Sequence, residues 1–164
     1  MTYGRVDAEV YEMIDRRNRR LTAELQRMEE KVREVKALEE IWHRLKFVVL
    51  ESNPSGYFRI RTMFNNHRLG AVSYPMLKQN VFRIFYDSLA GEVSDDNMIN
   101  LLTHIWGYLK KHVVESERDE VLDLIGELSK GNLDVTKRLF DLFADLHARH
   151  GKRNLMDPPL EGIV

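Results

Sequence analysis

Hydrophobic residues in the first third of the chain recur at alternating spacings of three and four. The stretch from Asp7 to Leu50 contains neither proline nor glycine. Written as heptads, its a and d positions hold the apolar residues Ile14, Leu21, Leu25, Met28, Val32, Val35 and Trp42. This narrow apolar seam predicts one long amphipathic helix of the coiled-coil type.

Two interpretations of this long helix stay open. In the first, residues 1–41 form a dimerisation element, because a seam this narrow usually packs against another helix. In the second, the helix lies on its own domain, and neighbouring apolar residues of its last turns widen the stripe. Asn18 and Glu39 occupy a positions, where they would weaken a coiled coil but define its register.

Turn and capping signals divide the rest of the chain, residues 42–164, into further helices. Helical periodicity is expected over residues 57–67, 76–89, 98–113, 116–130 and 133–150. The boundaries are predicted at Gly70, Ser73, Pro75, Gly91, Ser94, Ser116, Gly131 and Gly151. No segment alternates with period two for long. The expected fold is an all-α bundle of about six helices.

The predicted helix "NLLTHIWGYLKKH", residues 100–112, has a polar stripe beside its apolar one. Asn100, His104, Gly107 and Tyr108 fall at helical spacing. Glycine inside a helix costs about 1 kcal/mol relative to alanine, so a close approach over Gly107 is expected in compensation. Either another helix packs there, with the polar side chains bonded to backbone, or these four residues line a ligand pocket.

Composition narrows the classes of function. With 25 basic and 26 acidic residues, the overall charge does not indicate a polyanion binder, so a nucleic-acid role needs a local patch. The chain has no cysteine, which excludes thiolate chemistry and is typical of a reducing cytoplasm. No apolar stretch is long enough to span a membrane. We therefore expect a cytoplasmic protein.

The sequence contains no phosphate-binding loop, dinucleotide fingerprint or nucleophile elbow. His147 and His150 at i and i+3 could share one helix face, but no carboxylate-rich or cysteine partner accompanies them. We expect no metal and no cofactor, and we expect a binding protein rather than an enzyme.

The strongest candidate for a basic, nucleic-acid-binding patch is the stretch between Ser52 and Tyr86, which contains no acidic residue. The run holds the basic residues Arg59, Arg61, His67, Arg68, Lys78 and Arg83, interleaved with aromatic ones. Clustered arginines bind phosphates, and exposed aromatics stack on unpaired bases, so this run predicts an RNA surface. The alternative is that the aromatics are core and the arginines pair with the N-terminal helix.

Several motifs resemble the YbgA-like domain, a helical domain of unknown function. The central match comprises Asn100, His104, Gly107, Tyr108, Leu109 and Lys110, and Lys46, Tyr57, Glu117 and Gly131 match around it. The resemblance covers roughly residues 42–160. Polar positions of the family are replaced at Trp42, Ser52 and Ala144, and Ile60-Arg61 stands in place of leucine-glycine.

The resemblance implies a function. The family occurs alone or behind a thiouracil-desulfidase-type domain, and the fused form is associated with removing sulfur from 4-thiouridine in tRNA. There the helical part is proposed to hold the RNA. Because this chain lacks the cysteines of an iron–sulfur cluster, the resemblance implies an accessory module that acts with a separate desulfidase-type enzyme.

Three hypotheses follow. The first is a tRNA-binding accessory domain, with Lys46, Arg59, Arg61, Lys110 and Lys111 as candidate contacts. The second is a protein-interaction module that forms a homodimer through the N-terminal helix. The third is a small ligand-binding protein or enzyme centred on His104, which requires a concave pocket around that residue.

Overall fold

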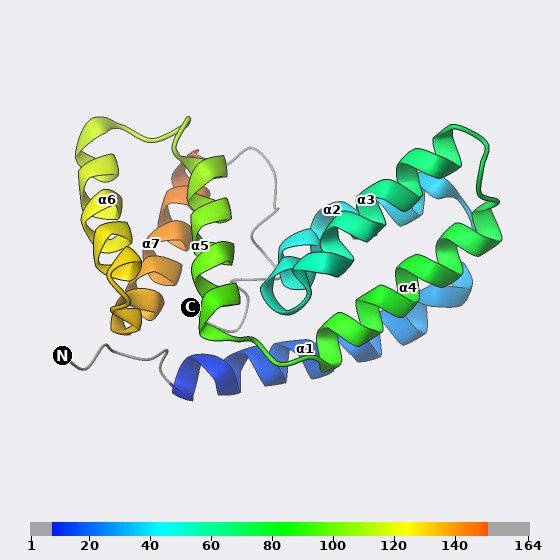
Figure 1. The fold of residues 1–164 in the computed structure, drawn as a ribbon, viewed down its shortest axis with the longest axis horizontal. Coiled ribbons are helices and arrows are strands. Elements are labelled where there is room, and N and C mark those ends of the chain that lie inside the picture. Colours follow the sequence, from blue (N-terminus) through cyan, green and yellow to red (C-terminus); the bar gives the residue numbers. More distant parts are fainter. Residues whose placement is uncertain (1–7, 151–164) are drawn as a thin grey trace.

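The computed structural model describes residues 8–150, and this part of the chain contains seven α-helices and no strand (Figure 1). The helices are α1 (Ala8–Met28), α2 (Val35–Ser52), α3 (Pro54–Arg68), α4 (Tyr74–Ala90), α5 (Asp95–Leu109), α6 (Glu115–Ser129) and α7 (Thr136–His150). Two short 3-10 turns, Glu29–Lys31 and Leu133–Val135, precede α2 and α7 respectively. The prediction of an all-α bundle is confirmed. The boundary predicted at Gly151 lies outside the described residues.

Capping residues begin three of the helices, two of them (α4 and α5) as the sequence predicts, whereas α3 begins at Pro54 and not near Tyr57 as expected. The Asn53 side chain accepts a hydrogen bond from the Gly56 backbone N–H at 2.9 Å, at the start of α3. Ser73 and Ser94 accept equivalent bonds at the starts of α4 and α5, at 3.4 and 3.1 Å. Each bond satisfies a backbone donor that the first turn of a helix leaves unpaired. Gly70, with φ of +79°, provides the reversal between α3 and α4.

The prediction of a single helix from Asp7 to Leu50 is wrong, because the chain reverses direction between α1 and α2. α1 ends at Met28, and the backbone is extended at Val32 and Glu34. No glycine or proline marks this turn. The reversal lets α2 fold back along α1, so tertiary packing outweighs local helix propensity here.

The apolar seam packs inside its own chain. Ile14, Leu21, Leu25, Val32 and Trp42 are all at most 6% exposed and belong to the molecule's hydrophobic cores. The surface that we assigned to a coiled-coil dimer is therefore already covered by the chain itself. The second interpretation, a helix lying on its own domain, is the one that the structure supports. The homodimer stays a prediction without an assigned surface.

Two hydrophobic cores lie side by side, and α1 runs beneath both (Figure 1). The first half of α1 packs with α5, α6 and α7, and its second half packs with α2, α3 and α4. Contacts between α2 and α5 join the two groups directly. The boundary that we expected between residues 41 and 42 falls inside α2.

A buried ion pair lies near the middle of α1. Arg17, 2% exposed, donates hydrogen bonds to both carboxylate oxygens of Glu51, at 2.5 and 3.3 Å. It also donates to the side-chain oxygen of Asn18. Burial raises the pKa of the Glu51 carboxyl, and the Arg17 charge acts in the opposite direction. The pair ties α1 to the end of α2.

The start of α6 differs from the prediction by one residue. α6 begins at Glu115, so Ser116 lies inside the helix and does not cap it. Instead, the Glu117 side chain accepts a hydrogen bond from the Val114 backbone N–H at 2.9 Å. An acceptor that reaches back in this way satisfies a backbone donor at the start of the helix.

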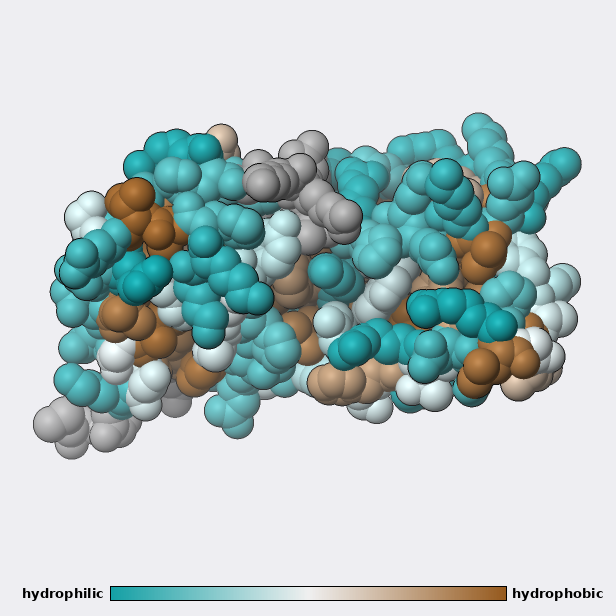
Figure 2. Space-filling model, turned by 90° about the horizontal axis from the view of Figure 1, so that it is seen from above, coloured by the Kyte–Doolittle hydropathy of each residue, from teal (hydrophilic) through white to brown (hydrophobic). Residues whose placement is uncertain are grey.

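The surface is mainly hydrophilic when the molecule is seen from above, with separate hydrophobic patches (Figure 2). Among residues 8–150, no helix is both long and apolar enough to cross a membrane.

Candidate nucleic-acid interface

Helix α3 has one buried face and one basic face. Gly56, Ile60 and Phe64 are buried against the core of α2 and α4. The opposite face exposes the side chains of Phe58, Arg59, Arg61, Thr62, Asn65 and Arg68. The periodicity of α3 thus separates its arginines from its core residues.

Phe58 is the exposed aromatic of this run, with 54% of its surface accessible. Phe64, Phe82 and Phe85 are buried, and Tyr57 and Tyr74 are half-buried. The alternative that most aromatics are core is therefore correct. One side chain suited to stacking on a base still lies on the basic face.

The arginines of α3 are not engaged by the N-terminal helix. Among the described residues, none forms an ion pair with Arg59, Arg61 or Arg68. Glu24 of α1 forms its ion pair with Arg44 of α2, at 4.0 Å, and not with an arginine of α3. The guanidinium groups of α3 are available to a ligand.

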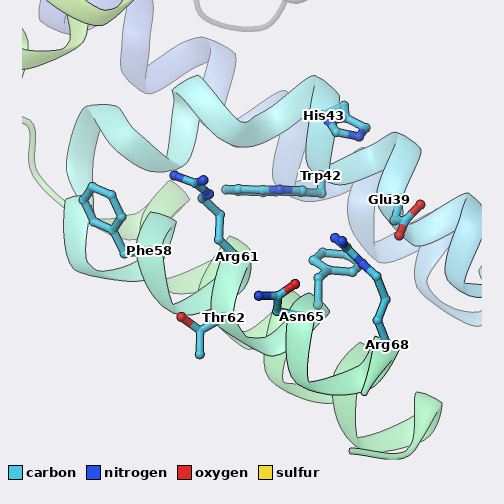
Figure 3. Close-up of a pocket in the computed structure, with 9 residues that line it drawn as sticks. Glu39, Trp42, His43, Phe58, Arg61, Thr62, Asn65 and Arg68 are labelled. Carbon is cyan, nitrogen blue, oxygen red and sulfur yellow. The ribbon is translucent and has the colours of Figure 1, made fainter. Parts of the chain in front are cut away.

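An open groove of about 610 Å³ lies between α2 and α3. From α2 it is lined by Glu39, Trp42 and His43 (Figure 3). From α3 the lining residues include Phe58, Arg61, Thr62, Phe64, Asn65 and Arg68. The volume lies within the range of about 300–1,000 Å³ that is typical of small-molecule sites. The lining is mainly polar, with aromatic side chains at Trp42, Phe58 and Phe64.

Aromatic contacts hold the groove's inner wall in place. The Trp42 ring packs on Tyr57 and Phe85, with centroid separations of 5.3 and 6.5 Å. The Arg61 guanidinium lies 5.9 Å from the centre of the Tyr57 ring. Figure 3 shows this guanidinium beside the Trp42 indole, while Arg68 extends toward Glu39 from farther along α3. A cation over an aromatic face is an attractive arrangement.

The polar stripe of α5 lies on the surface. His104 is exposed, and Asn100, Gly107 and Tyr108 are half-buried. Among the described residues, no atom lies within 4 Å of a Cβ built on Gly107, so this part of the chain does not make the close approach that we expected over the glycine. The Tyr108 ring lies 6.1 Å from the ring of His112. A ligand site centred on His104 stays a prediction.

The other basic candidates are dispersed. Lys110 and Lys111 are exposed at the carboxyl end of α5, whereas Arg59 and Arg61 lie in the early turns of α3 (Figure 1). Lys46 is half-buried, with its ammonium 5.2 Å from the centre of the Phe47 ring. The structure places Arg61 and Arg68 in the groove, Arg59 outside its lining, and the two lysines at the end of α5 on the other bundle.

The histidines of α7 take separate roles. His147 is buried, whereas Nε2 of His150 lies 3.0 Å from Glu117. Arg149 also pairs with Glu117, at 2.6 Å. Within residues 8–150, no three histidine or acidic side chains cluster in a way that could hold a metal ion.

Comparison with known proteins places the chain in a family. A family model described as a protein of unknown function, DUF1722, matches residues 46–157. The chain belongs to the DUF1722 family. No curated protein and no solved structure gives a significant match.

The DUF1722 match begins inside α2, so it includes all of α3 to α7 but not α1. The groove is thus built from both sides of this boundary, since Glu39, Trp42 and His43 precede the matched region. From the sequence, Trp42 was noted as a seam residue and as a replaced family position, but not as part of a site. The missed signal was its neighbourhood, because Glu39, Trp42 and His43 at i, i+3 and i+4 share one helix face.

Proposed function

We propose that this DUF1722 protein is a non-catalytic RNA-binding accessory domain whose main contact surface is the exposed face of α3. One observation supports it most: three arginines without ion-pair partners and an exposed phenylalanine share that face among the described residues. Arginines bind phosphates, and a phenylalanine can stack on an unpaired base.

The proposed RNA is tRNA, and the proposed context is thiouridine metabolism. This part rests on the YbgA-like resemblance, with which membership of DUF1722 is consistent. The chain has no cysteine, so the sulfur chemistry is assigned to a separate desulfidase-type enzyme. Lys110 and Lys111 would supply a second basic contact at the end of α5.

The test is tRNA binding by fluorescence anisotropy over a series of salt concentrations. Replacing Arg59 and Arg61 together by alanine should weaken binding and lower the slope of log K against log salt by about 1.4–1.8. The variant Lys110→Ala/Lys111→Ala should also weaken binding if the surface extends to α5.

The matched control is Arg16→Ala/Arg19→Ala, which removes two exposed arginines from α1. This control should bind tRNA as the unmodified protein does. No tRNA binding at low salt, or an equal loss in the control, would show that the proposal is wrong.

A further inference from the structure

We propose that the groove between α2 and α3 binds a single unstacked nucleotide through its base and its 5′ phosphate. This inference rests on the proposed RNA-binding function and assigns one subsite within it. The position is defined by Phe58 and Arg61 on α3, beside the wall that Trp42 of α2 forms.

The phosphate position follows from Arg61. Arg68 also lines the groove, but it lies two turns farther along α3 and extends toward Glu39, the acidic residue of the lining (Figure 3). Guanidinium groups bind phosphate through paired N–H donors. Contact with the Tyr57 ring orients Arg61 before any ligand arrives, which lowers the entropy cost of binding.

The base position follows from Phe58, which is exposed at the rim and can stack on a base. Trp42 is buried by its packing on Phe85 and forms the wall of the groove. Arg61 follows Phe58 by three residues, about 4.5 Å along the helix axis, so a base at the rim leaves its phosphate near Arg61.

The experiment titrates the full chain with UMP, uridine and inorganic phosphate, followed by NMR shifts of the groove residues. UMP should bind at least about tenfold more tightly than uridine or phosphate, because it alone engages both halves of the site. Arg61→Gln and Phe58→Ala should each weaken UMP binding about tenfold.

The control is Arg83→Gln, which changes an exposed arginine of α4 outside the groove lining and should leave UMP binding unchanged. Circular dichroism checks that each variant is folded. Equal affinity for UMP and uridine, or no shifts in the groove, overturns the inference.

Parallel tRNA binding separates the two proposals. If tRNA binds through the α3 arginines while UMP does not enter the groove, the nucleotide subsite is wrong and RNA binding stands. If UMP binds in the groove but tRNA does not bind, the proposed function is wrong and the subsite stands.

Discussion

Gly107 lies in the last turn of α5, where a methyl group would meet no atom of the described residues. Its backbone is helical, so alanine can replace it without strain. Gly56 in α3 is the opposite case, because a Cβ there would lie 2.5 Å from the Asn53 side chain and 2.8 Å from Ile84. Gly56 is therefore required by its close neighbours, whereas the space around Gly107 does not require a glycine.

Gly107→Ala should raise the free energy of unfolding by up to about 1 kcal/mol, because alanine loses less backbone entropy in a helix and this glycine lies in the last turn. Urea denaturation measures the change. Gly56→Ala is the matched comparison and should destabilise, since it displaces the cap of α3. A destabilised Gly107→Ala protein would contradict this account of open space over α5.

Among the contacts between helices, those of Glu117 connect the start of α6 to the end of α7. The hydrogen bond from the Val114 backbone N–H lowers the pKa of the Glu117 carboxyl, and the partners His150 and Arg149 lower it further, against the opposing effect of burial. The ionised carboxylate is therefore the form that this contact favours.

A carboxyl whose folded pKa is lowered stabilises the fold above its unfolded pKa, and this contribution is lost as pH falls through the folded pKa. We expect the unfolding free energy to decrease as pH falls below about 4.3, the ordinary value for glutamate. In Glu117→Gln, this part of the decrease should be absent. Denaturation at a series of pH values checks it, and identical pH profiles would contradict it.

Across the molecule as a whole, α1 joins two bundles into one folding unit. Its first half completes the core of α5 to α7, and its second half completes the core of α2 to α4. The buried pair of Arg17 and Glu51 lies where these halves meet. A change at this point should affect the stability of both bundles.

Glu51→Ala should cost about 3–5 kcal/mol, because it removes the carboxylate that forms an ion pair with the buried Arg17 charge. The variant Arg17→Met/Asn18→Ala/Glu51→Met should recover most of this loss, since buried ion networks and apolar replacements are often of similar stability. Asp141→Ala, which breaks an exposed pair with Lys137, is the control and should cost about 0.3–0.5 kcal/mol. Equal losses at the two sites would contradict the role of burial.

The helical class and most helix boundaries follow from the order of residues alone. Apolar periodicity and capping residues such as Ser73 and Ser94 act locally, so a short stretch of sequence contains their signal. The same locality predicted that the residues of the α5 stripe share one face. The basic character of α3 could also be predicted, because it depends on residue type.

The tertiary structure determined which partners the apolar helix faces pack against. The reversal after Met28 has no local signal, and it turned an expected dimer seam into part of the internal cores. It also left Trp42 of α2 beside Arg61 of α3, in the groove that these two helices form. Packing partners depend on contacts between distant residues, and periodicity along one helix does not encode them.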